Sequence, residues 1–335
     1  MRRTISFIAV AAAMLIGSGC AKEIKTSDND SAKRYFDAWI SVHHPELEKS
    51  GLGIYIYDDI PGSGPAITDA TYLYVTYTTT DLKGNVSGTN DIDVAKKIGK
   101  YDKTYCYDPS VWIQSTQYAG VKEMLKGMKI GGKRTAIIPS WLMNTAEYGS
   151  EEEYLSKTKP DNNASNAIYT IEVVDSTDHI YNKQIEKIEK YLQDRFGEKT
   201  DSTYYGFYYK QRKAPTSDKK FPDDTTIYIN YTGRLLNGQV FDTTIEDTAK
   251  KYNIYNSGKS YGPTSVKWAA DSTALQLGGN GVIGGFSLTL WQMKAFESGT
   301  GVFHSGFGYS ASGQGNTIPG YAPLAFDIEI VEKED

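Results

Sequence analysis

Apolar and polar residues alternate along several stretches of this chain, and these stretches follow a similar order in its two halves. Residues 71–86 and 226–240 both alternate with a period of two and both contain a glycine, Gly84 or Gly238, near the point of reversal. A period of two places every second side chain on one face of a strand. Each stretch is therefore predicted to be a strand that enters a hairpin. The predicted inner faces carry Leu73, Val75 and Tyr77 in the first half and Ile227, Ile229 and Tyr231 in the second.

A short amphipathic helix and a closing strand are predicted after each hairpin. Apolar residues recur at helical spacing at Val121, Leu125 and Met128 in the first half, and at Phe286, Leu290 and Met293 in the second. Alternating strands follow at residues 167–174 and 324–331. Matching positions lie roughly 155–165 residues apart, which is a repeat on the scale of whole domains. The pattern indicates an internal duplication.

Antiparallel strands that wrap around one short helix belong to the α+β class, and we predict two such domains. A charged helical stretch separates the halves, and its Lys and Glu residues are expected to form a solvated face. The predicted organisation is a signal peptide at 1–20, a tether and helix at 21–50, a first domain at 51–177, a helical linker at 178–200 and a second domain at 201–335.

The N-terminal segment predicts export. Arg2 and Arg3 precede an apolar run at residues 5–16, which is too short for a permanent membrane span, and small residues lead to Cys20. This arrangement resembles a bacterial lipoprotein signal, in which Cys20 becomes the lipidated first residue. Gly17 stands where that pattern usually has Leu, and an ordinary secretory signal is the alternative. We expect a protein of the bacterial cell envelope that a lipid at Cys20 anchors to the outer membrane, facing either the periplasm or the cell surface.

Composition and spacing exclude several classes of function. The net charge of −5 without basic clusters argues against nucleic acid as a partner. Two cysteines predict no disulfide framework, and the four histidines show no metal-ligand spacing. Residues 279–284 match G-x-G-x-x-G, but no alternating βαβ pattern surrounds them, so nucleotide binding is not expected.

The second half carries an ordered series of motifs. It reads YTGRLLNGQVFDTT, then LQLGGNGVIGGFSLTLWQM, then GFGYSASGQGNTIPGYAPLAFDIEIV. Across nearly all of residues 205–333 this series resembles the FKBP-type peptidyl-prolyl cis-trans isomerases. The resemblance implies a bent antiparallel sheet wrapped around a short helix, with an aromatic pocket between them. The implied pocket residues are Tyr231, Phe241, Asp242, Val282, Ile283, Phe286, Tyr309, Ile318 and Phe326.

The resemblance also implies a mechanism that needs no metal or cofactor. An X-Pro bond has a rotational barrier of about 18–20 kcal/mol, and a site that binds the twisted amide better than the planar amide lowers it. Ile283 N–H and the Tyr309 hydroxyl would hold substrate carbonyls, whereas Asp242 would act electrostatically and Tyr231 would help to position the amide. The apolar walls would bind proline-containing unfolded or flexible polypeptides.

Simpler interpretations remain for two of these residues. Phe326 lies on the closing strand and is typical of a core residue. Asp242 precedes two threonines, as a turn-capping Asp would. The long polar segment 243–274 departs from the family, and we assign no pocket aromatic within it. Its candidates are Tyr252, Tyr255, Tyr261 and Trp268.

The first half departs further from the family. When the two halves are aligned, Ser87-Gly88 correspond to Phe241-Asp242, and Gln117-Tyr118 correspond to Val282-Ile283. Val121 replaces Phe286, and KPDNNASN replaces the Ile-Pro loop. The first domain is therefore expected to keep the fold and to lack the pocket.

These observations favour an envelope peptidyl-prolyl isomerase that assists protein folding, with its activity in the second domain. The alternative is an FKBP-fold binding or chaperone module without catalysis. A glycan-binding lipoprotein is a third possibility, and it rests only on the abundance of aromatic residues.

Overall fold

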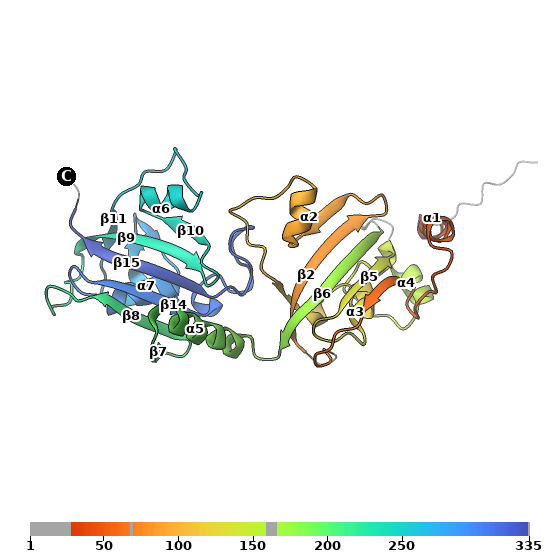
Figure 1. Cartoon of the computed structure of the whole chain (residues 1–335), viewed down its shortest axis with the longest axis horizontal. Coiled ribbons are helices and arrows are strands. Elements are labelled where there is room, and N and C mark those ends of the chain that lie inside the picture. The colour runs from red at the N-terminus through yellow and green to blue at the C-terminus, as the bar shows by residue number, and fades with distance from the viewer. Residues whose placement is uncertain (1–27, 68–69, 159–165, 334–335) are drawn as a thin grey trace, which may run out of the picture.

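The computed structural model describes residues 28–67, 70–158 and 166–333 of the chain. Two antiparallel sheets follow one another, and each packs against short helices (Figure 1). The signal segment with Cys20 and most of the KPDNNASN stretch lie outside the described residues.

The first sheet has the strand order β1-β5-β6-β2-β3, with β4 paired to β2. Helix α1 (Asp28–His43) precedes these strands and packs against the core of this half. Phe36 and Ile40 of α1 are buried in the core of this half. The elements of this half after α1 are β1 (Tyr55–Ile60), β2 (Tyr72–Asp81), β3 (Val86–Thr89), α2 (Ile92–Lys97), β4 (Ser110–Ile113), η1 (Gln114–Thr116), α3 (Ala119–Leu125), β5 (Lys133–Ile138), η2 (Ser140–Leu142), α4 (Glu151–Lys157) and β6 (Ala167–Thr177).

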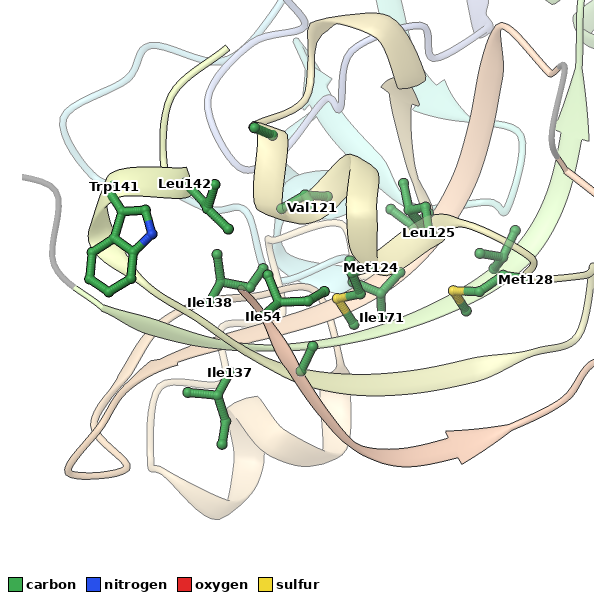
Figure 2. Close-up of a cluster of buried hydrophobic side chains, with 14 of the residues drawn as sticks. Ile54, Val121, Met124, Leu125, Met128, Ile137, Ile138, Trp141, Leu142 and Ile171 are labelled. Atoms are coloured by element: carbon green, nitrogen blue, oxygen red, sulfur yellow. The ribbon is translucent and has the colours of Figure 1, made fainter. Parts of the chain in front are cut away.

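Helix α3 supplies the centre of the first core (Figure 2). Its residues Val121, Met124 and Leu125 are at most 1% exposed. They face Ile138 of β5 and Ile171 of β6, which have no exposed surface. The helical spacing of apolar residues in the sequence thus corresponds to a helix that buries one face against the sheet.

The second sheet has the order β13-β12-β11-β9-β15-β14-β8-β7, with β10 paired to β9. Its long central strands surround α7 in the same way as the strands of the first half surround α3 (Figure 1). The elements are α5 (Ile180–Phe196), β7 (Ser202–Tyr204), β8 (Phe207–Lys213), β9 (Thr226–Leu235), β10 (Val240–Thr243), α6 (Glu246–Lys251), β11 (Thr264–Lys267), η3 (Ser272–Ala274), β12 (Gln276–Leu277), β13 (Asn280–Gly281), α7 (Gly284–Gln292), β14 (Ser298–Phe303), η4 (Ser305–Phe307) and β15 (Leu324–Val331).

Glycines allow α7 to approach the sheet closely. A Cβ at Gly285 would lie 2.4 Å from the Phe303 ring, and a Cβ at Gly301 would lie 1.8 Å from Thr289 Oγ1. Neither position can accept a larger side chain without displacing the helix. The close approach explains Gly285, the second glycine of the pair that begins this helix.

Helix α5 covers the outer face of the second sheet. Ile188 and Leu192 are buried with Tyr208 of β8 and Val302 of β14, so the helix has an apolar face as well as a charged one. Arg195 near its end donates two hydrogen bonds, of 2.9 and 3.0 Å, to the Asp327 carboxylate on β15. The segment between the halves is therefore packed on the second domain.

The strand registers confirm that the two halves are equivalent. Gly88 pairs with Thr79 across β2 and β3, and Asp242 pairs with Gly233 across β9 and β10. An irregularity in the register precedes both pairs on the outer strand. A threonine pair with hydroxyls 2.9 Å apart follows each of them. The bulge that places Asp242 is thus present in both domains, and only its side chains differ.

Candidate functional site

A cavity of about 590 Å³ opens between α7 and the second sheet. Every pocket residue predicted from the sequence lines it. The complete lining is Tyr231, Phe241, Asp242, Leu277, Gly281, Val282, Ile283, Phe286, Tyr309, Gln314, Thr317, Ile318 and Phe326. Residues separated by almost a hundred positions in the chain therefore share one concave surface, which is the usual form of a small-ligand or peptide site.

Three aromatic rings form the floor of the cavity. The Phe286 ring meets Tyr231 edge-on, with centroids 5.4 Å apart, and meets Phe326 edge-on at 5.2 Å. Phe286 and Phe326 are only 3% and 5% exposed. Edge-to-face contacts of this kind stabilise a fixed arrangement of rings. Phe326 therefore both packs in the core and lines the cavity.

Gly233 leaves room for two of these rings. A Cβ at this position would lie 2.6 Å from the Phe241 ring and 2.8 Å from the Phe326 ring. The third residue of the Tyr-Thr-Gly motif must therefore lack a side chain if Phe241 is to lie over the strand. In the first domain the equivalent residue is Thr79, and it faces Gly88 rather than an aromatic side chain.

Asp242 lies at the rim of the cavity and has three polar partners. The Tyr231 hydroxyl donates a 2.6 Å hydrogen bond to Asp242 Oδ2. The backbone N–H of Thr243 donates to Asp242 Oδ1 at 2.9 Å, as a turn-capping Asp would accept. Lys259 forms an ion pair with Oδ1. The Asp242 carboxylate thus caps the turn and also lines the cavity.

The hydroxyl groups around Asp242 remain protonated at neutral pH. Burial raises the pKa of Tyr231 far above its ordinary value, and the Asp242 charge raises it further. Burial also raises the pKa of Tyr309, with a contribution from Asp242. Tyr231 therefore keeps the proton that it donates to Asp242, and the Tyr309 hydroxyl can also act as a hydrogen-bond donor.

The start of α7 supplies backbone donors to the opposite wall. Ile283 is the N-cap residue of this helix, and its backbone is extended at φ −63° and ψ 149°. The first N–H groups of a helix have no partner within the helix, and the helix dipole places partial positive charge there. Val282 and Ile283 thus offer an apolar wall and a polar backbone at the same place.

The loop between β14 and β15 closes the third side. Its residues Gln314 and Ile318 form an isolated antiparallel bridge, with Gln314 N–H donating to Ile318 O at 2.7 Å. A Cβ at Gly313 would lie 2.3 Å from Ile318 O, so the loop folds tightly on itself. Gln314, Thr317 and Ile318 line the cavity, and the bridge holds them together.

The sequence indicated only part of this lining. Leu277, Gly281, Gln314 and Thr317 were not predicted, although all of them flank motifs that were. The four aromatic candidates in segment 243–274 do not belong to the lining. Trp268 is buried against Phe221 and Trp291, and Tyr255 stacks on Tyr261. Lys259 of this segment forms an ion pair with Asp242 at the rim of the cavity, and no apolar pattern would indicate that residue.

The first domain has different residues at the equivalent positions. Tyr118 is the N-cap residue of α3, just as Ile283 is of α7, and Val121 takes the position of Phe286. Ser87 and Gly88 occupy the bulge. The bulge of this domain has the same register as that of the second domain, but it lacks the Phe ring and the carboxylate.

The described residues contain no group of three or more His, Cys, Asp or Glu side chains that could hold a metal ion. None of the described helices is both long and apolar enough to cross a membrane.

Comparison with known sequences identifies the family of the second domain. Residues 217–331 match the family model of the FKBP-type peptidyl-prolyl cis-trans isomerases. This part of the chain belongs to that family. Both domains have an antiparallel sheet that packs against a short helix, as the sequence predicted.

Two known proteins are similar to part of the chain. The chain is 31% identical over 126 residues to the "Macrophage infectivity potentiator" of Trypanosoma cruzi, covering 37% of this chain and 52% of that protein. It is 29% identical over 110 residues to "FK506-binding protein 1" of Dictyostelium discoideum, covering 33% and 82%. The chain therefore spans about half the length of the first relative.

A similar solved structure is more distant in sequence. The crystal structure of FkpA from Escherichia coli is 18% identical to this chain and covers 45% of it, with 61% of FkpA matched and a TM-score of 0.31.

Proposed function

We propose that the second domain catalyses cis-trans isomerisation of X-Pro bonds in unfolded or flexible polypeptides. The observation that carries the proposal is the single cavity that joins the aromatic floor, Asp242, the start of α7 and Tyr309. These groups are the ones that the reaction requires. The prolyl ring needs an apolar recess, and the amide needs donors that act without proton transfer.

The aromatic floor would act by withdrawing water from the reacting amide. A planar amide is more dipolar than a twisted one, because resonance between nitrogen and carbonyl is lost on rotation. A recess lined by Phe241, Phe286 and Phe326 solvates the planar form poorly and thus favours the twisted form. The Phe rings also exclude alternative positions of the prolyl ring.

The polar groups would fix the peptide on either side of proline. Tyr309 can donate from its protonated hydroxyl, and Ile283 can donate from its backbone N–H to a substrate carbonyl. Asp242 would act beside the rotating amide through its charge, and Tyr231 orients that carboxylate through the 2.6 Å hydrogen bond. No covalent bond changes in this mechanism.

The first domain would not catalyse the reaction. Its bulge carries Ser87 and Gly88, and its helix presents Val121 where the second domain has Phe286. We assign it a binding or positioning role within the chain.

We propose that the protein acts in the bacterial cell envelope, and the N-terminal segment, which resembles a lipoprotein signal, supports this proposal. Lipid attachment at Cys20 would leave the described domains outside the cytoplasm, tethered by the polar stretch that follows. Metabolic labelling with an alkyne-bearing palmitate in a bacterial host tests this. Label should enter the full chain and be absent from Cys20→Ser, and a labelled Cys20→Ser protein would contradict the assignment.

The catalytic proposal is tested by isomerisation of a short Leu-Pro peptide. The full chain should accelerate it, and the double variant Asp242→Ala/Phe286→Leu should lose at least about 100-fold in kcat/KM. Leu at 286 keeps most of the buried volume, so near-UV circular dichroism should still report a folded domain. Wild-type activity in the double variant would remove the proposed site.

One observation favours the non-catalytic alternative. The ion pair with Lys259 offsets the Asp242 charge, which weakens its electrostatic action on a substrate. A wild-type chain that binds the Leu-Pro peptide in calorimetry but does not accelerate its isomerisation would establish a binding module.

A further inference from the structure

Residues 104–108 of the first domain contact two separate walls of the second-domain cavity. Cys106 N–H donates a 2.8 Å hydrogen bond to Asn316 O in the β14–β15 loop. The Gln239 side chain in the β9–β10 hairpin donates to Thr104 O at 2.7 Å. At the tip of that hairpin, Asn237 Nδ2 donates to Asp108 Oδ2 at 2.8 Å. We call residues 104–108 the bridging segment.

Each of these contacts lies close to residues that line the cavity. The β9–β10 hairpin carries Phe241 and Asp242 two and three positions after Gln239. The loop carries Thr317 and Ile318 directly after Asn316. The bridging segment thus connects the wall with the carboxylate to the wall with Ile318, at the edge of the second domain that faces the first (Figure 1).

The loop tip separates two cavities. Gln314, Thr317 and Ile318 line the substrate cavity, whereas Gly315 and Asn316 line a second cavity of about 500 Å³ between the domains. Tyr105, Cys106 and Tyr107 line that second cavity from the first domain. A displacement of the first domain would therefore move Gly315 and Asn316, and with them the neighbouring loop residues that line the substrate cavity.

The bridging segment has a counterpart in the second domain. Tyr101 stacks on Tyr107 with centroids 5.6 Å apart, and Tyr255 stacks on Tyr261 at 5.5 Å. Both later tyrosines accept a backbone hydrogen bond from the residue five positions earlier. In the second domain this turn brings Lys259 to Asp242. In the first domain the equivalent turn contacts the second domain instead, so the two copies of this turn have different roles.

We infer that the bridging segment is a positioning element that sets the width of the proline cavity and thereby its selection of substrates. This inference rests on the proposed isomerase site. The aromatic floor is formed by residues of the second domain alone, whereas Cys106 of the bridging segment packs against the core around it. The two walls lie on the β9–β10 hairpin and on the β14–β15 loop. The distance between these two elements depends on the contacts that the bridging segment makes with each of them. A narrow, fixed opening discriminates between residues of different size next to proline.

The inference predicts which kinetic quantity changes. When the walls loosen, kcat for a good substrate changes little, because the floor is intact. Discrimination between Leu-Pro and Ala-Pro peptides falls, because the fit around the neighbouring side chain is lost. A general loss of folding would instead lower activity on both peptides equally.

The Asn237–Asp108 pair allows a test with rescue in the full chain. Asn237→Asp keeps the side-chain oxygen that accepts the Gln239 N–H within the turn, and it places two carboxylates together at the interface. Asp108→Asn in the same chain exchanges the two groups and restores a donor and an acceptor. Asn85→Asp is the matched control, because Asn85 Nδ2 donates to Asp81 Oδ2 at 2.8 Å in the first-domain hairpin, away from this interface.

Two readouts are measured on each variant: the ratio of kcat/KM for Leu-Pro and Ala-Pro peptides, and amide hydrogen exchange at Gln314 and Ile318. Asn237→Asp should lower the ratio about three- to fivefold and raise exchange at both amides about fivefold or more. Asn237→Asp/Asp108→Asn should restore both values, and Asn85→Asp should change neither. An unchanged ratio and unchanged exchange in Asn237→Asp, or a double variant without rescue, would overturn the inference.

Failure of the proposed catalysis would be distinguishable from failure of this inference. A chain without isomerase activity still has the exchange readout, and calorimetric affinity for the two peptides replaces the kinetic ratio. Altered exchange with altered affinity ratio would then support the positioning role in a binding module.

Discussion

The Tyr231 hydroxyl on β9 donates a 2.6 Å hydrogen bond to Asp242, which directly follows the bulge in β10. Tyr231 also contacts Phe286 edge-on, so one side chain links the carboxylate to the aromatic floor. In the first domain Tyr77 occupies the equivalent strand position, but Gly88 offers no carboxylate to it. The hydrogen bond between Tyr231 and Asp242 is therefore one interaction that the second domain has and the first domain lacks.

Tyr231→Phe should lower the isomerase kcat/KM of the full chain about tenfold. The substitution keeps the ring and the aromatic contacts and removes the hydrogen bond to a charged group, which is typically worth about 1.5–3 kcal/mol. Steady-state isomerisation of a Leu-Pro peptide measures the effect. Tyr77→Phe in the first domain is the control and should leave the rate unchanged. A rate in Tyr231→Phe equal to that of the unmodified chain would show that the orientation of Asp242 does not matter.

Lys259→Met should raise kcat/KM at low ionic strength by up to about fivefold. Lys259 and Asp242 are both more than a third exposed, so their attraction is partly screened by water and salt. Without the lysine, the carboxylate acts on the substrate with its full charge. The gain should shrink in high salt, and Lys251→Met on α6 should not produce it. A fall in activity at low salt would mean that Lys259 itself contacts the substrate.

Gly233→Thr should abolish substrate binding while the domain remains folded. Threonine is the residue found at this position in the first domain, as Thr79, so the strand accepts it. In the second domain its side chain would displace the Phe241 and Phe326 rings from the cavity. Calorimetric titration with a Leu-Pro peptide should show at least about tenfold weaker binding. Thr79→Gly is the matched control, and unaltered binding by Gly233→Thr would refute the account of this glycine.

Asp327→Asn should lower the free energy of unfolding of the second domain by about 3 kcal/mol, because Arg195 and Arg234 would lose a buried partner. Glu329→Gln on the same strand removes only an exposed pair with Lys213 and should cost less than about 1 kcal/mol. Urea denaturation measures both changes. Equal effects of the two substitutions would contradict a structural role for the buried pair.

The same carboxylate predicts how stability depends on pH. Burial alone would raise the pKa of Asp327, but hydrogen bonds from Arg195 and Thr300, together with the guanidinium charges, hold that pKa below its ordinary value. A lowered pKa in the folded state contributes stability that is present above the unfolded value, about 3.9, and is lost as the pH falls through the folded value. Asp327→Asn should therefore weaken the loss of stability between pH 5 and pH 3. An acid limb identical to that of the unmodified chain would contradict this assignment.

The sequence predicted those features that depend on local pattern. Alternation located β9 and β15, helical spacing located α7, and the contrast between Phe241-Asp242 and Ser87-Gly88 corresponds to one bulge in both domains. These features are visible because strands and helices impose fixed periods on buried residues.

Contacts between distant segments were not predictable in the same way. Lys259 reaches Asp242 through a turn whose residues show no apolar period. The contacts of Cys106 and Asp108 with the second domain depend on the relative placement of two domains, which no local pattern encodes. Thr317 and Gln314 line the cavity because a bridge holds the loop tip, and both are polar residues in a polar stretch.

Exchange of the bulge residues tests the central claim most directly. The full chain with Phe241→Ser and Asp242→Gly carries the first-domain sequence at the second-domain bulge, where the backbone already has the same register. Its rate of Leu-Pro isomerisation is compared with that of the unmodified chain and of Ser87→Ala. The account predicts an uncatalysed rate for the exchanged chain and full activity for Ser87→Ala. Retained activity in the exchanged chain would contradict the assignment of catalysis to the second domain.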